Sequence, residues 1–184
     1  MNHSASSDPA PRAVFTIGHS TRSIEDFVTL LETHGVEQLV DIRTIPRSRT
    51  NPQFNRDELP KSLERDRIGY LHMPSLGGLR HPRKDSPNTG WRNASFRGYA
   101  DYMQTPGFDE ALAKLMELAQ KKQIAIMCAE AVPWRCHRSL VADALTARGV
   151  AVEHIMSATR RQPHQLTPFA KLEGAHVLYP GLFS

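Results

Sequence analysis

Short apolar runs alternate with segments of helical periodicity along this chain. Five runs are mostly apolar, which is typical of strands buried on both faces; they span residues 13–17, 36–42, 68–73, 124–128 and 150–155. Between them, apolar residues recur at the spacing of one helix face, as in Ile24, Phe27, Val28 and Leu31, or Phe108, Leu112, Leu115 and Leu118. The alternation predicts an α/β fold, with a mainly parallel central sheet of about five strands and helices on both faces.

Local signals predict where several helices begin and end. Ser23 is a predicted N-cap, and Gly35 and Gly149 are predicted helix stops. A short helix is expected near Asp57, with Pro60 in its first turn, where no backbone donor is lost.

The length of 184 residues suits one domain with a sizeable core. We expect a single α/β domain over residues 13–184, after a disordered polar tail over residues 1–12. Residues 74–98 form a long polar insertion, of the kind that is usually functional or disordered. The segment after Ser157 is expected only to dock as a short helix or strand.

Polar and reactive side chains follow each predicted strand. They are His19 and Ser20, then Asp41 and Arg43, then His72 and Gly77-Gly78, then Cys128 and Glu130, then His154 and Ser157. The carboxyl ends of parallel strands meet at one edge of a sheet, where ligands bind. We therefore predict that His19, Asp41, Glu130 and Cys136 gather around one cleft at this edge.

Both cysteines flank the turn between the fourth strand and the next helix. A thiol at Cys136 near a helix N-terminus, beside Arg138, would have a lowered pKa and could be a nucleophile assisted by His137. Alternatively, the cysteine is structural. Zinc binding by Cys128, Cys136, His137 and His19 is a further alternative, although the short Cys-x(2–4)-Cys spacing of structural zinc sites is missing. We predict no metal and no cofactor.

Two carboxylates follow neighbouring strands. Glu130 or Asp41 would activate a water molecule as a general base. Alternatively, Asp41 pairs with Arg43 or Arg138 and holds loops together.

Basic side chains and aromatic rings are interleaved in two loops. The candidate ligand-binding residues are Arg43, Arg47, Arg49, Trp91, Arg92, Phe96, Arg97, Tyr99 and Arg138. Cations hold phosphates and aromatic faces stack bases, while Asn88 and Asn93 could read base edges. The alternative is that these charges are solvated and that the aromatic rings anchor the loops.

The net charge and the cysteine count bear on the protein's partners and on its cellular compartment. A net charge of +4 and a pI of about 9.3 are compatible with a nucleic acid or a phosphate-bearing partner. Two cysteines and the lack of a long apolar run predict a cytoplasmic protein with reduced thiols and no membrane partner. The oligomeric state is left open.

Several stretches together resemble the domain of unknown function 488 family. The matching motifs are Thr16-Ile17-Gly18-His19-Ser20, Val40-Asp41-Ile42-Arg43, Leu76-Gly77-Gly78, Phe96-Arg97-Gly98-Tyr99, Cys128-Ala129-Glu130 and Cys136-His137-Arg138. The resemblance implies a compact α/β domain and supplies no settled activity. Longer members with an insertion like Asn88 to Arg92 are sometimes labelled DNA-repair proteins.

We therefore expect an enzyme or binding protein that acts on nucleic acid or nucleotides, with hydrolysis of an N-glycosidic bond in base-damage repair as the reaction to consider. In that hypothesis Glu130 activates water, His19 orients the leaving group and an aromatic ring stacks a displaced base. The alternatives are a cysteine-dependent enzyme on a small anionic substrate and a non-catalytic binding module.

Overall fold

A six-stranded sheet runs through the centre of the protein. The computed structural model describes residues 12–183, so the predicted tail lies outside the described residues except for Arg12. The strands of the sheet are β1 (Val14–Gly18), β2 (Gln38–Asp41), β3 (Gly69–His72), β4 (Ile124–Cys128), β5 (Val152–Ser157) and β6 (Arg160–Pro163). Their order is β3-β2-β4-β1-β5-β6, and every pairing is parallel except that of β5 with β6. The five predicted strands are confirmed, and β6 adds a sixth.

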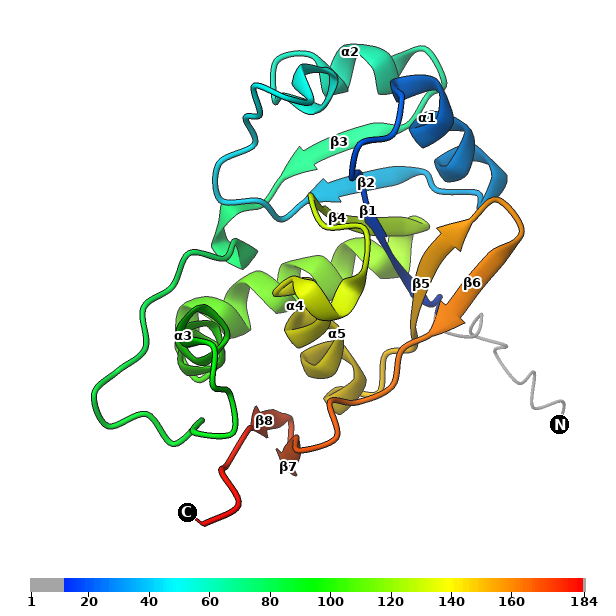
Figure 1. Ribbon diagram of the computed structural model, residues 1–184. Coiled ribbons are helices and arrows are strands. Elements are labelled where there is room, and N and C mark those ends of the chain that lie inside the picture. The colour runs from blue at the N-terminus through cyan, green and yellow to red at the C-terminus, as the bar shows by residue number, and fades with distance from the viewer. Residues whose placement is uncertain (1–11, 184) are drawn as a thin grey trace, which may run out of the picture.

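Helices cover both faces of this sheet (Figure 1). The α-helices are α1 (Ile24–Thr33), α2 (Leu59–Glu64), α3 (Ala94–Tyr102), α4 (Pro106–Lys121) and α5 (Arg138–Ala147). Three short 3-10 helices are η1 (Pro52–Phe54), η2 (Pro74–Leu76) and η3 (Pro133–Arg135). Helices α1 and α2 lie on one face, and α3, α4 and α5 lie on the other. The protein is therefore a single α/β domain, as the alternating pattern predicts.

Alternate residues of each central strand enter two separate cores. Val40 and Ile126 pack in the cluster beneath α4 and α5, whereas Leu39 and Met127 pack in the cluster beneath α1 and α2. Successive side chains of a strand point to opposite faces, so a strand covered on both sides is apolar at most positions. This requirement explains why the strands read as continuous apolar runs.

Strand β4 lies between β1 and β2 and brings three strand ends together. In the register, Gly18 is level with Cys128, and Asp41 is level with Met127. The segments that follow β1, β2 and β4 therefore leave the sheet side by side. Strands β5 and β6 turn away toward the end of α1 (Figure 1), so the residues after β5 do not join them.

The predicted helix signals are mostly confirmed. The Ser23 hydroxyl accepts from the backbone N–H of Asp26, Pro60 lies in the first turn of α2, and Gly149 follows α5 with a left-handed φ of 78°. The Ser23 hydroxyl pairs a backbone N–H that the helix start leaves free, and Pro60 has no such N–H to pair. The left-handed Gly149 lets the chain leave the helix.

The polar insertion of residues 74–98 includes the start of a helix. Helix α3 begins at Ala94 because the Asn93 side chain accepts from two backbone N–H groups in its first turn. Gly98 lies inside the helix, where a Cβ atom would come within 2.3 Å of the Arg80 carbonyl oxygen. This glycine permits close packing of the insertion against the helix and is not a helix stop.

The C-terminal segment covers the insertion. It forms β6 and a hairpin of β7 (Lys171–Glu173) and β8 (His176–Leu178). The buried Asn88 accepts from the Tyr179 backbone and donates to Asp101, and the Trp91 ring packs against Phe169 and Tyr179. Asn88 is therefore a structural contact, because its amide groups are already used within the fold.

Candidate functional site

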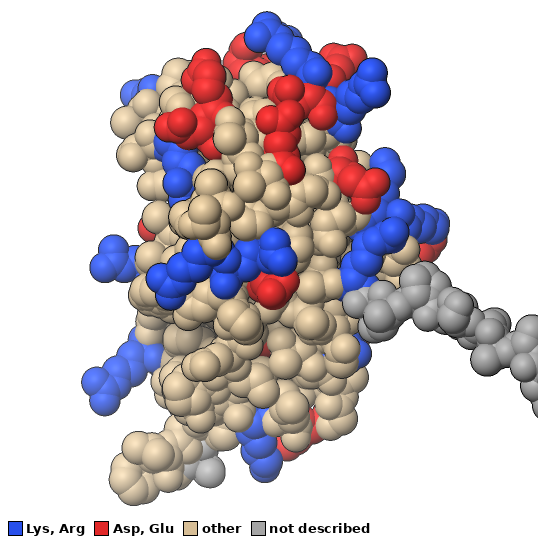
Figure 2. All heavy atoms as spheres, turned by 90° about the vertical axis from the view of Figure 1, so that its right-hand side faces the viewer, with Lys and Arg blue, Asp and Glu red and all other residues tan. Residues whose placement is uncertain are grey.

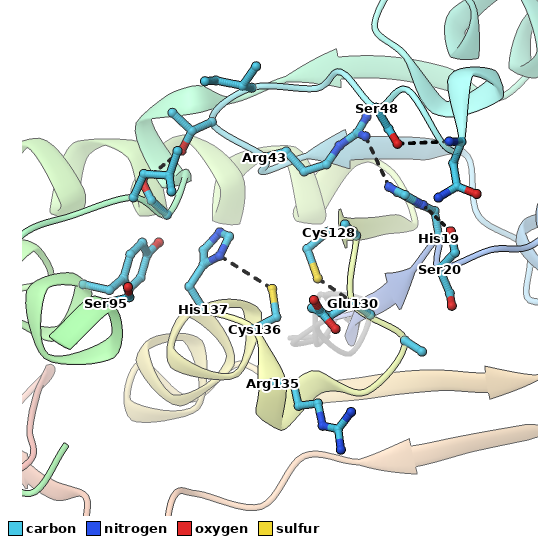
Figure 3. A pocket seen from close by; sticks show the side chains of 18 of the residues that line it. His19, Ser20, Arg43, Ser48, Ser95, Cys128, Glu130, Arg135, Cys136 and His137 are labelled. Atoms are coloured by element: carbon cyan, nitrogen blue, oxygen red, sulfur yellow. Dashed lines mark hydrogen bonds between the residues drawn. The ribbon is translucent and has the colours of Figure 1, made fainter. Parts of the chain in front are cut away.

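A cavity of about 820 Å³ opens at the carboxyl edge of the sheet. Its wall is built by the segments after β1, β2, β3 and β4, with the starts of α3 and α5 (Figure 3). The predicted site residues that line it are His19, Glu130, Cys136, Arg43, Arg47, Phe96 and Tyr99. The predicted cleft is thus present, in the place that open parallel sheets favour.

Two cysteines meet on the wall of this cavity. Cys128 is the last residue of β4, and Cys136 lies just before α5. Their sulfur atoms face one another (Figure 3), and both side chains are unbridged thiols that are 2% and 7% exposed. The backbone N–H of Arg138 donates to the Cys136 sulfur at 3.4 Å. The site therefore holds two interacting thiols at the start of a ten-residue helix.

The pKa values of the two thiols are shifted in opposite directions. Burial opposes ionisation of Cys128, but its hydrogen bond with Cys136 and the Arg138 charge together lower the pKa of Cys128. The same hydrogen bond, with burial, raises the pKa of Cys136 well above its usual value. The first ionisation of the pair is therefore favoured and the second is opposed.

His137 contacts the pair through a defined ring nitrogen. Its Nε2–H donates to the Ile42 carbonyl at 3.1 Å, which leaves the Nδ1 lone pair facing the Cys136 sulfur at 3.5 Å. Burial, together with the charges of Arg138 and Arg80, lowers the pKa of His137 to about 4. Tyr99 packs on the imidazole, with ring centroids 4.9 Å apart. His137 is thus a neutral, fixed hydrogen-bond acceptor for the thiol.

Arg138 lies behind the cysteines. Its side chain is 1% exposed and does not line the cavity, so direct contact with a ligand, as predicted from the sequence, would require movement of the cavity wall. Its Nη2 donates weakly to the Ala131 carbonyl at 3.4 Å, while Nε and Nη1 are buried without a hydrogen-bond partner. Within residues 12–183 no carboxylate forms an ion pair with this guanidinium, and its charge helps to lower the pKa of Cys128.

Asp41 does not line the cavity, which corrects the predicted gathering of four residues. Its buried carboxylate accepts from the Arg43 backbone and guanidinium at 2.7–3.1 Å, and from the Tyr70 hydroxyl at 2.6 Å. Burial and this carboxylate raise the pKa of Tyr70. Asp41 is therefore a structural counter-ion of Arg43, the second of the two roles that the sequence left open.

His19 lies on the cavity wall beside Arg43. The guanidinium donates to His19 Nε2 at 3.3 Å, and the other ring nitrogen, Nδ1–H, donates to the Ser20 carbonyl at 2.8 Å. Burial and the Arg43 charge lower the pKa of His19 to about 4. The ring also stacks on Phe54 at 4.3 Å. Both nitrogens are occupied, which suits positioning better than proton transfer.

Glu130 is the carboxylate among the residues that line the cavity. Its side chain is exposed and makes no hydrogen bond or ion pair within the described chain. Its charge is close enough to Cys128 to oppose ionisation of that thiol. Glu130 therefore remains available to a ligand or a water molecule.

Several predicted ligand-binding residues are used by the fold instead. Arg97 donates twice to the Trp91 carbonyl, and Trp91 packs on Phe96, Phe169 and Tyr179 outside the cavity. Tyr99 is buried, and its hydroxyl donates to the Leu76 carbonyl. For these three residues the anchoring role is the one the contacts support.

The remaining candidates lie at or beyond the rim. Arg47 is exposed and lines the cavity, whereas Arg49 and Arg92 are exposed outside it. Ile45 and Leu79, which are 66% and 73% exposed, add an apolar rim. On the face that carries β5 and β6, basic and acidic side chains are interspersed (Figure 2), so that face presents no continuous basic stripe.

A zinc site has no ligand set in the described chain. No group of three or more histidine, cysteine or carboxylate side chains is arranged to hold a metal ion between residues 12 and 183. Two histidine nitrogens that could bind a metal are already engaged. His137 Nε2 donates to a carbonyl, and His19 Nε2 accepts from an arginine.

Sequence reasoning missed the contact between Cys128 and Cys136. From the sequence, Cys128 is one of the reactive residues at the strand ends and a possible zinc ligand, but not a partner of Cys136. The available signal was the position of Cys128. It ends a central strand, and a short turn separates it from a second cysteine near the start of a helix. Arg135, which the sequence offers only as a second charge near the Cys136 thiol, also lines the cavity.

The fold and the site define a class: an α/β domain with an open, mainly parallel sheet and a thiol-lined cavity at its carboxyl edge. The chain belongs to the family described as Domain of unknown function DUF488, whose model matches residues 23–145. No curated protein and no solved structure matches the chain. As for membranes, helices long and apolar enough to cross a bilayer are missing from the described residues.

Proposed function

We propose that this protein is an enzyme that binds a small anionic substrate in the cavity and attacks it with a thiolate of the Cys128–Cys136 pair. The observation that carries the proposal is the contact of two thiols on the cavity wall, beside a buried guanidinium that has no carboxylate partner. A charged group of this kind is costly to bury unless an opposite charge is close. A thiolate beside Arg138 would supply that charge.

Cys136 is the proposed attacking sulfur. It is the more exposed of the two, and it accepts the Arg138 backbone N–H at the start of α5. Its hydrogen bond with Cys128 and burial raise the pKa of Cys136, so Cys136 would become the thiolate by passing its proton to Cys128. A helix N-terminus and a nearby cation favour a charge at that position. An imidazole with a pKa of about 4 does not carry the thiol proton at neutral pH, so His137 is a positioning residue that orients the thiol.

The cavity lining supports an anionic substrate with an apolar portion. Arg47 and Arg135 are exposed guanidinium groups that would hold a carboxylate or a phosphate. Ile45, Leu79 and Phe96 would cover apolar atoms of the substrate. Glu130 would move protons during turnover. We place the reaction in the cytoplasm, where thiols remain reduced.

Alkylation by two small probes tests the proposal. Iodoacetate is anionic and iodoacetamide is neutral, and mass spectrometry identifies the modified sulfur. We expect iodoacetate to modify Cys136 faster than it modifies a free cysteine at pH 7, and Arg47→Met and Arg135→Met to slow iodoacetate but not iodoacetamide. If both probes react no faster with the folded protein than with free cysteine, the proposal is overturned.

A nucleotide or a nucleic acid is the second candidate substrate. It is favoured by one observation: exposed Arg47 and half-buried Phe96 line the same cavity as Glu130. Arg47, Arg49 and Arg92 would contact phosphates, Phe96 would stack on a base and Glu130 would activate water for N-glycosidic hydrolysis, as in base-damage repair.

Gel shifts at several salt concentrations, on single-stranded, duplex and lesion-bearing DNA, test this candidate. Phosphate contacts release counterions, so real binding weakens steeply with salt. The absence of a shift at low salt would remove the nucleic-acid candidate. Full turnover by Glu130→Gln would eliminate the proposed role of that carboxylate.

A further inference from the structure

We infer that Cys128 and Cys136 form a redox dithiol that reduces small anionic disulfides and closes into an intramolecular disulfide. The inference rests on the proposed thiolate chemistry. It goes further by giving Cys128 a role of its own, as the resolving thiol, and by naming the substrate class.

The backbone around the pair holds the two sulfurs in contact. The backbone N–H groups of His19 and Ser20 donate to the carbonyls of Cys128 and Ala129 at 3.0 and 2.9 Å, which fixes the turn after β4 against β1. At the other end of this turn, the Ser139 backbone N–H donates to the Cys136 carbonyl at 3.1 Å. The sulfurs face each other from two anchored segments (Figure 3), as a resolving reaction requires.

The charges around the pair suit thiol–disulfide exchange. Exchange needs one thiolate to attack and one neighbouring thiol to resolve. The pKa of Cys128 is lowered and that of Cys136 is raised, so losing one proton from the pair is easier than losing two. Because the sulfurs are in contact, a single short proton transfer places the charge on Cys136, where the Arg138 backbone N–H receives it.

The reaction is balanced without a further oxidant. The Cys136 thiolate attacks one sulfur of a disulfide RSSR, forms a mixed disulfide and releases RS⁻, which takes from water the proton that the dithiol released when it ionised. Cys128 then loses its proton and attacks the Cys136 sulfur, which forms the Cys128–Cys136 bond and releases the second RS⁻, protonated in turn. The protein dithiol loses two electrons, and RSSR gains them as two RSH.

The cavity selects the substrate by charge and size. Its volume of about 820 Å³ is in the range of small-molecule sites. Arg47 and Arg135 favour a disulfide that bears carboxylates over one that bears amines. Glutathione disulfide is therefore the chosen probe, with cationic cystamine and neutral hydroxyethyl disulfide as comparisons.

The full-length protein is incubated with each probe, quenched with acid and analysed by mass spectrometry. We expect the wild type to form the internal disulfide and Cys128→Ser to accumulate a mixed disulfide with glutathione on Cys136. Cys136→Ser is expected to form neither product. Glutathione disulfide is expected to react at least about tenfold faster than cystamine, the lower end of typical electrostatic rate enhancements.

Three results would overturn the inference: unmodified thiols in the wild type, a wild-type mixed disulfide that never closes, or a preference for cystamine. Circular dichroism checks that each serine variant is folded, and Cys128→Ala repeats the trapping if Cys128→Ser is not. The iodoacetate assay separates the two proposals. Rapid alkylation without disulfide formation defeats only the dithiol, whereas slow alkylation defeats the proposed thiolate as well.

Discussion

The Nδ1 atom of His137 lies 3.5 Å from the sulfur of Cys136, and the opposite ring nitrogen donates to the Ile42 carbonyl at the end of β2. The carbonyl fixes the tautomer, so the lone pair of the imidazole must face the thiol. Ile42, which follows β2, thereby fixes the imidazole that orients Cys136 just before α5. The site thus depends on segments that are far apart along the chain.

Replacement of Arg138 by methionine should change the thiol more than it changes the fold. Two of its guanidinium nitrogens are buried without partners, and buried ionic groups can often be replaced by apolar side chains at little cost. We expect an unchanged or higher free energy of unfolding and a higher pKa of the reactive thiol, measured by urea unfolding and by alkylation rate against pH.

Arg135→Met is the matched control for Arg138→Met, because Arg135 is exposed and lies on the same turn. It should leave both the thiol pKa and the unfolding free energy unchanged. The role of Arg138 is contradicted if Arg138→Met lowers the free energy of unfolding by more than about 2 kcal/mol, on the scale of a broken buried interaction. It is also contradicted if that variant keeps the wild-type thiol pKa.

Asp41→Asn should destabilise the protein strongly. The substitution leaves the buried Arg43 guanidinium without its counter-ion, and breaking a buried ion pair costs on the order of 3–5 kcal/mol. Asp85→Asn, which breaks the exposed pair with Arg83, should change the stability little, because solvent screens this pair. Denaturant unfolding compares the two variants, and similar small losses in both would contradict the structural role of Asp41.

Gly18→Ala should disturb the turn that carries Glu130. An added Cβ atom would lie 1.7 Å from the Glu130 carbonyl oxygen, so the backbone must move, and overpacking of this kind costs about 1–3 kcal/mol or more. We expect lower stability together with altered alkylation of the cysteines. Gly107→Ala is the control, since its nearest atom is 3.9 Å away. If the two variants have the same stability and the same alkylation rates, the expected clash at Gly18 is contradicted.

Acid should destabilise the protein from pH 7 downward. The pKa values of His19, His137 and His154 are lowered to about 4, 4 and 3, chiefly by burial, from the ordinary value of 6.5. As the pH falls through 6.5, the unfolded chain binds protons that the folded chain does not. Each histidine then removes on the order of 1 kcal/mol per pH unit until its folded pKa is reached.

Urea unfolding between pH 7 and 5 measures this dependence. His154→Gln should reduce the slope by about one proton, whereas His81→Gln, at an exposed position, should leave it unchanged. A stability that does not vary over this range would rule out three buried neutral histidines.

The roles of individual residues were harder to predict than their location. Asp41 and Glu130 both follow central strands, yet one is enclosed by Arg43 and Tyr70 and the other is exposed to the cavity. Trp91 lies in the basic, polar insertion and Tyr99 just after it, yet Tyr99 is part of the core and Trp91 packs against it. Such differences depend on contacts with distant segments, which local sequence patterns do not encode.

The sequence by itself determined the α/β architecture, the five parallel strands and the edge at which the site lies. Apolar periodicity and the geometry of parallel strands act locally and leave a readable pattern. The tertiary structure alone decided that Cys128 meets Cys136, that Arg138 lies behind them without a carboxylate, and that Asp41 is enclosed. Those outcomes follow from the insertion of β4 between β1 and β2, a long-range pairing that sets which loop ends become neighbours.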